Sequence, residues 1–243
     1  MIKNWNDTPR RKKVFKRLKA LYNKIPDTVG CMENIESCKG WCCRLQNPQV
    51  LNCEFLYVWS YIMENWDAEQ ISGLMERCLR SYLSNNFNKS CVFWDSETKL
   101  CMTHTRRPFN CHIYGITPNE EIQPRVDALR EANKDNLMAQ VRDQCDLVST
   151  ESGEEVTSSM TSEWWDEMQA IEQELGIKAR DINDAPGGSY RTYHDYIIMM
   201  LLGNEMMGQL SLLRQHGDQL EKEVFLKKYV EIFKKGLEDK EDE

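Results

Sequence analysis

Ten cysteines are the feature that most constrains what this chain of 243 residues can fold into. Nine of them lie between Cys31 and Cys111. The sequence begins without the apolar core of a secretion signal, and its longest apolar run, Ile197 to Leu202, is far shorter than the ~20 residues of a membrane span. We therefore expect a cytoplasmic protein that does not enter a membrane. Reduced thiols at this density more often bind metal than form disulfides.

Seven of the thiols are the predicted metal ligands: Cys31, Cys38, Cys42, Cys43, Cys91, Cys101 and Cys111. A single zinc ion takes four ligands, so seven thiols exceed one mononuclear site. Neighbouring residues project in different directions, so Cys42 and Cys43 rarely both reach one ion, and a disulfide between them would be strained. The pattern predicts either two metal sites or a cluster of several irons. We favour an iron–sulfur cluster, most simply [4Fe–4S], and keep zinc as the alternative.

The remaining thiols are weaker candidates. Cys78 shares one face of a predicted helix with apolar residues, so we expect it in the core. Cys53 or Cys145 could supply an extra ligand. His104 and His112 lie inside the cysteine motif, where an exposed position or a place next to the ligands is the expected role.

Two arginines stand next to predicted ligands and are the predicted cofactor-binding residues. A guanidinium at Arg44 or Arg107 would offset thiolate charge and donate hydrogen bonds to sulfur without binding the metal. For Arg107, a surface charge ahead of the turn-forming Pro108 is an equally good interpretation.

Helical periodicity dominates the rest of the sequence. Helices are predicted after the cap Thr8-Pro9, from Asp67, over Arg125–Val148, over Trp164–Leu175, over Thr192–Gln215 and over Asp218–Leu237. The stretch Ser149–Ser162 is predicted as a loop or linker, and Asp181–Ser189 as a break. Cys91–Trp94 and Leu100–Thr103 flank a turn and predict a small β-hairpin that needs a metal staple.

These elements predict a mainly α fold with a small β-hairpin, in which a cysteine-rich, metal-stapled region packs on a C-terminal helical bundle. The expected organisation is a basic N-terminal helix (residues 1–25), a cysteine-cluster metal-binding domain (26–118) and a helical domain with an acidic tail (119–243).

Charge is uneven along the chain. Residues 1–25 carry nine Lys and Arg against one acid, a net +8, which leaves −16 for the rest of a chain of net charge −8. An ordinary surface helix with a solvated basic face is the main interpretation. The acidic remainder would repel phosphate backbones, so nucleic acid is disfavoured, and a protein partner is expected instead.

The sequence gives little support for nucleotide binding, dinucleotide binding or hydrolase activity. Walker, GxGxxG, HExxH and GxSxG motifs are absent from the sequence. His194 lies in a Tyr- and His-rich stretch and could act as a general base, although a residue at the start of a helix is the more common role. The paired methionines of the apolar helix are expected in the core.

The cysteine pattern resembles a known family. The residues that carry the resemblance are Cys38-Lys-Gly-Trp-Cys42-Cys43-Arg44, then Cys91-Val-Phe, Cys101 and Arg107-Pro108-Phe-Asn-Cys111-His-Ile-Tyr-Gly. In this order they are similar to the bacterial cysteine-cluster proteins of the CxxCxxCC type, described as zinc- or iron-chelating domains. The first two gaps are wider here, six and three residues in place of two, and three thiols align in the second half in place of four. The resemblance implies metal binding.

A relative of that family, the flagellin lysine N-methylase, is described as carrying an iron–sulfur cluster. The first functional hypothesis is therefore an iron–sulfur protein with an electron-transfer or accessory role. A methylase-like enzyme that uses S-adenosylmethionine is the second, although the sequence has no glycine-rich donor loop. A zinc-stapled protein-interaction module is the third. The sequence leaves open whether any reaction is catalysed.

Overall fold

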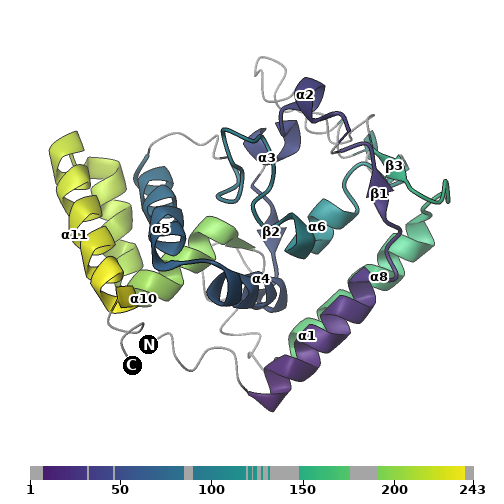
Figure 1. Cartoon of the computed structure of the whole chain (residues 1–243), viewed down its shortest axis with the longest axis horizontal. Helices are drawn as coiled ribbons and strands as arrows, with labels where there is room; N and C mark the ends of the chain where they lie inside the picture. Colours follow the sequence, from purple (N-terminus) through teal and green to yellow (C-terminus); the bar gives the residue numbers. More distant parts are fainter. Residues whose placement is uncertain are drawn as a thin grey trace. The chain divides into compact units, whose positions relative to one another are not determined.

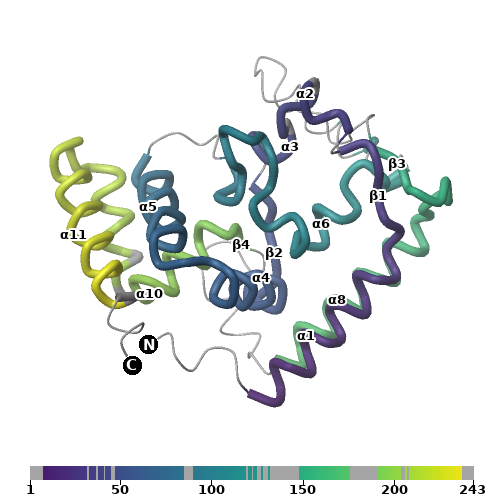
Figure 2. The backbone as a smooth tube through the Cα atoms, in the orientation of Figure 1, coloured from purple at the N-terminus to yellow at the C-terminus, as the bar shows by residue number. Residues whose placement is uncertain are grey.

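The computed structural model describes residues 8–238 apart from 32, 46, 85–89, 119, 122, 125, 126, 128–130, 132–147 and 176–190. The described residues are mainly helical, with small antiparallel strand pairs, which confirms the predicted fold class. They form two compact units, each assembled from segments that are distant in the sequence (Figure 2). The first unit comprises residues 1–41, 50–54 and 107–189, and the second comprises 42–49, 55–106 and 190–243.

Two long helices, α1 (Pro9–Tyr22) and α8 (Ser158–Glu174), lie side by side in the first unit (Figure 1). The predicted cap is present, because the Thr8 hydroxyl accepts a hydrogen bond from the Arg11 N–H and Pro9 opens the helix. The apolar stripes of the two helices are buried at Val14, Leu18, Leu21, Trp164, Met168 and Ile171. Burial of these stripes is the main source of stability for such a helix pair.

Several charges of the basic N-terminal helix are paired with acids of α8. Arg17 and Lys13 both contact the Glu174 carboxylate, and Lys24 lies 2.6 Å from Glu167. Partly exposed ion pairs of this kind contribute little to stability, about 0–1 kcal/mol each. They do show that part of the basic face of the N-terminal helix contacts acidic side chains of α8 and not only solvent.

The predicted loop or linker Ser149–Ser162 is a loop only over residues 151–157, and the prediction is wrong at both ends. Ser149–Thr150 forms strand β3, which pairs antiparallel with strand β1 (Thr28–Val29). Helix α8 begins at Ser158, because the Thr157 hydroxyl accepts a hydrogen bond from the Met160 N–H. The same Ser and Thr residues that are typical of a loop serve here as helix cap and strand.

Glu54 is a buried junction of the first unit. Its carboxylate accepts hydrogen bonds from the N–H of Leu51 at 2.9 Å, the N–H of Phe109 at 2.6 Å and the hydroxyl of Tyr22 at 3.0 Å. Phe109 begins the short helix α6 (Phe109–His112), so one carboxylate joins three separate segments. Burial raises its pKa from 4.5 to about 7, although the three donors and the nearby Glu172 also act on it.

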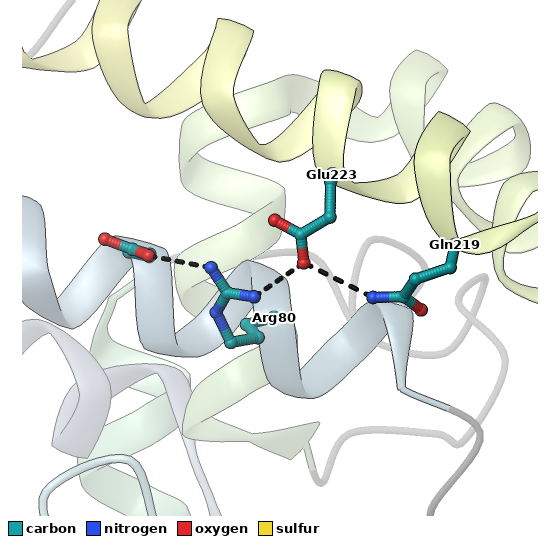
Figure 3. A network of polar contacts seen from close by, with 4 residues as sticks. Arg80, Gln219 and Glu223 are labelled. Carbon is teal, nitrogen blue, oxygen red and sulfur yellow. Dashed lines mark hydrogen bonds and ion pairs between the residues drawn. The ribbon is translucent and has the colours of Figure 1, made fainter.

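The second unit is built on helix α5 (Ala68–Leu83), which packs against α10 (Tyr193–His216) and α11 (Gln219–Glu238) (Figure 1). Asp67 caps α5 as predicted, in a reciprocal box with Gln70. Arg80 of α5 lies 2.7 Å from Glu223 of α11, and Gln219 donates to the same carboxylate (Figure 3). This network is exposed and orients the helices more than it stabilises them.

Helix α10 departs from the single straight helix that the sequence predicts. Gly203 has φ 74° and breaks it, and the segments Tyr193–Gly203 and Gly208–His216 are bent by 115°. Glycine adopts this backbone conformation without the strain that a Cβ would cause. In the part of the chain that the structure describes, no single helix is long and apolar enough to cross a membrane, and these two segments pass that test only as a bent pair.

Most of the predicted helix Arg125–Val148, the predicted break Asp181–Ser189 and the end of the acidic tail lie outside the described residues. The apolar stretch that begins at Phe55 belongs to helix α4 (Asn52–Asn65), whose residues from Phe55 onward are in the second unit. The proposed domain boundaries stay a prediction.

Replacing Glu54 by Gln should reduce the pH dependence of stability. The carboxyl loses its proton near pH 4.5 in the unfolded chain but near 7 in the folded one. The folded state therefore binds more protons in between, and the free energy of unfolding falls as the pH rises through this window, by about 3 kcal/mol. Urea unfolding of the full chain at several pH values measures this slope. An equal slope in the wild type and in Glu54→Gln would contradict the assignment.

Candidate metal centre

The adjacent cysteines lie on a short helix, α3 (Trp41–Leu45), with both thiols half-buried. Their sulfurs are 3.9 Å apart. A disulfide bond is about 2.0 Å long, so Cys42 and Cys43 are free thiols. Two thiols at this separation can both contact a single metal ion, because the edge of a tetrahedron with metal–sulfur bonds of about 2.3 Å is about 3.8 Å. Whether Cys42 and Cys43 bind the same ion stays a prediction.

Cys91 and Cys101 lie on two segments that form a minimal hairpin. Trp94 and Cys101 make an antiparallel bridge, and the Met102 N–H donates to the Phe93 carbonyl at 2.8 Å. The Asp95 side chain closes the turn by accepting hydrogen bonds from the N–H groups of the residues two and three positions on. The predicted hairpin is therefore present, with its pairing reduced to one bridge.

A backbone hydrogen bond joins the hairpin to the adjacent pair. The Cys91 N–H donates to the Cys43 carbonyl at 2.7 Å. The pKa of the Cys91 thiol is raised to about 12, chiefly by burial and to a smaller extent by the thiols of Cys101 and Cys42. The N–H groups of Phe93 and Trp94 act in the opposite direction on the same sulfur. Four predicted ligands, Cys42, Cys43, Cys91 and Cys101, are thus neighbours within the second unit; we call them the thiol quartet.

The quartet has the chemistry of a metal site, although its side chains do not yet converge. Among the described residues, no three Cys, His, Asp or Glu side chains are arranged to hold one ion. Four thiolates nevertheless match the full ligand set of structural zinc and of iron–sulfur clusters. The backbone N–H groups of Phe93 and Trp94 lower the pKa of the Cys91 thiol, but burial raises it more, so a metal ion would have to displace the thiol proton to bind this sulfur.

The other three predicted ligands belong to the first unit. Cys31 and Cys38 lie around the short helix α2 (Ile35–Cys38), and Cys111 lies on α6; all three thiols are half-buried. Helix α6 is held by the Phe109 ring, 5.7 Å from Trp165, and by the His112 ring, which stacks on Tyr22 at 4.5 Å.

The predicted cofactor-binding arginines occupy different places. Arg44 lies on α3, directly after the adjacent pair. Arg107 is in the first unit, where its guanidinium donates to the Thr28 hydroxyl at 2.9 Å. Their roles toward a cluster stay predictions, as do the ligand assignments. His104, at the start of the helical turn His104–Arg106, is exposed.

The remaining described cysteines have core environments. Cys78 is fully buried on α5, as expected, and burial raises the pKa of its thiol. Cys53 is also fully buried, with its sulfur 3.9 Å from that of Met168. Burial, followed by the charges of Glu172 and Glu54, raises the pKa of the Cys53 thiol well above its ordinary value. Both residues are therefore kept as neutral thiols, and Cys145 lies outside the described residues.

Sequence reasoning missed one contact next to the quartet. His194, at the start of α10, is 3% exposed, and its Nδ1 is 2.5 Å from Nδ2 of Asn47. The position of His194 in a Tyr-rich stretch drew attention to it. No signal in the sequence indicated Asn47, because a contact between positions so far apart follows no local pattern.

Fold and site together define a thiol-rich, mainly helical protein with the ligand set of a metal-binding domain. Residues 31–146, which are 116 of the 243 and include all ten cysteines, match the model of the CxxCxxCC family, described as "Putative zinc- or iron-chelating domain". The match over this segment confirms the resemblance that the cysteine pattern indicates. No curated protein and no solved structure gives a significant match to the chain.

Replacing Cys91 or Cys42 by Ala should lower metal affinity by more than about 100-fold, because loss of an outer-shell residue alone already costs 10- to 100-fold. The matched control is Cys78→Ala, which removes a buried thiol of the same unit and should lower stability while leaving metal content unchanged. Elemental analysis measures the metal content of each variant, and competition with a chelator measures its metal affinity. Full metal content in Cys42→Ala and Cys91→Ala would show that the quartet is not the site.

Proposed function

We propose that this chain is a metal-binding protein whose centre is held by the thiol quartet. One observation carries the proposal: four thiols on two distant segments meet in one compact unit, joined by the hydrogen bond from Cys91 to Cys43. The family description supports metal binding independently and names zinc and iron.

For the metal, we propose an iron–sulfur centre with a redox or accessory role. The separation of 3.9 Å between the sulfurs of Cys42 and Cys43 favours a centre in which both contact the same ion. In a [2Fe–2S] cluster with four cysteines, each iron takes two thiolates, so the adjacent pair would serve one iron and Cys91 with Cys101 the other. A [4Fe–4S] cluster takes one thiolate for each iron and would require Cys42 and Cys43 to separate.

Zinc is the second candidate, and the same distance supports it. The sulfur separation is close to the tetrahedral edge of about 3.8 Å expected for a single zinc ion. Zinc would act as a staple for a hairpin of one bridge and a helix of five residues, neither of which is stable by itself. The protein would then serve as an interaction module without redox activity.

Anaerobic purification followed by metal and sulfide analysis and EPR separates these candidates. Iron and acid-labile sulfide in equal amounts, with an EPR signal after reduction, are expected for the iron–sulfur proposal. Stoichiometric zinc without sulfide, retained in a colourless protein, would overturn it in favour of the staple. Absence of bound metal after reconstitution with either metal would overturn the metal-binding proposal itself.

A further inference from the structure

The first turn of helix α10 is a well-defined structure within the second unit. Thr192 caps it, and the Asp195 carboxylate accepts from both the N–H of Thr192 at 3.1 Å and its hydroxyl at 2.6 Å. Strand β4 (Arg191–Thr192) leads directly into the helix. The two residues that follow the cap, Tyr193 and His194, are almost fully buried. Their positions are therefore set by the fold.

These two buried residues contact both metal-bearing segments. The Tyr193 ring meets the ring of Phe93 edge-on at 4.8 Å, two residues after Cys91. His194 contacts the Asn47 side chain, four residues after Cys43. One helical turn thus touches the segment that carries the adjacent pair and the segment that carries Cys91.

We propose that His194 is a positioning residue of the thiol quartet, which fixes the adjacent pair relative to Cys91 through its hydrogen bond to Asn47. The inference rests on the proposed function, because it concerns the same four thiols. The Asn47 amide donates to Nδ1, which assigns the imidazole proton to Nε2. Such outer contacts orient metal ligands and affect affinity almost as much as the ligands themselves.

The hydrogen bond between Asn47 and His194 is mostly buried, although Asn47 as a whole residue is half-buried. His194 is 3% exposed, and the Asn47 Oδ1 atom is buried without a hydrogen-bond partner among the described residues. A buried polar group that loses its partner costs about 1–3 kcal/mol. The position of Asn47 relative to the first turn of α10 would therefore no longer be fixed if either side chain of the pair were removed.

The test uses the full chain and Co(II) as the probe, because thiolate-to-cobalt charge-transfer bands report the number and geometry of sulfur ligands. The variants are Asn47→Leu and His194→Phe, which remove the hydrogen bond at similar volume, the double variant, and Asn47→Asp, which can accept from an N–H on Nδ1. Asn65→Leu is the matched control, since Asn65 bonds only locally to the Tyr61 carbonyl on α4.

We expect about tenfold weaker Co(II) binding and altered charge-transfer bands in each single variant. The double variant should be no weaker than either, Asn47→Asp should recover most of the affinity, and Asn65→Leu should match the wild type. Wild-type binding and spectrum in Asn47→Leu, or losses that add in the double variant, would overturn the inference. Should His194→Phe not fold, the half-buried Asn47 variants decide alone.

A parallel titration of Cys91→Ala separates this inference from the proposed function. If Cys91→Ala binds Co(II) as the wild type does, the quartet is not the site and the proposed function fails. If Cys91→Ala loses Co(II) while Asn47→Leu keeps both affinity and spectrum, the quartet stands and only the role of His194 fails.

Discussion

The hydrogen bond from the Cys91 N–H to the Cys43 carbonyl, 2.7 Å long, is the contact on which the candidate centre depends. It joins two segments that lie far apart in the sequence and are each too short to keep a shape alone. Cys91 is almost fully buried, so this N–H could not exchange its partner for water without a cost of about 1–3 kcal/mol. The bond holds the two pairs of thiols in one neighbourhood before any metal binds. Binding of a metal ion would therefore cost less conformational entropy, because these two chain segments are already held together.

The surrounding elements compensate for the weakness of these segments. The hairpin has one bridge, and α3 has five residues, whereas α5, α10 and α11 form a packed group of long helices. The first turn of α10 contacts both thiol-bearing segments, through the Tyr193 ring on Phe93 and through His194 on Asn47. Short segments that carry metal ligands can hold a fixed geometry when they lie next to such helices. The contacts that the ligands' neighbours make with the helices then determine where the ligands lie.

The first unit uses a different kind of support. Two buried carboxylates receive hydrogen bonds from several segments, Glu54 as described above and Glu172 from the Cys53 N–H at 2.8 Å and from Asn52. Buried carboxylates are costly unless donors satisfy them, so the segments that supply those donors are held together. The same arrangement anchors α6, which carries Cys111. Glu174 and Glu167 of α8 form ion pairs with Arg17 and Lys24, so part of the basic charge near the N-terminus is neutralised inside the first unit.

Local sequence signals determined much of this protein. Thr8-Pro9 and Asp67 correctly marked helix starts, apolar spacing identified Cys78 as core, and the cysteine pattern indicated a metal-binding family, because caps, helical faces and ligand spacing are all properties of neighbouring residues. Only the tertiary structure decided that Ser149–Thr150 is a strand, that α10 bends at Gly203, and that Cys42, Cys43, Cys91 and Cys101 share one unit with Asn47 and His194. These features depend on contacts between residues that are distant in the chain, and such contacts follow from how whole segments pack rather than from any repeat in the sequence.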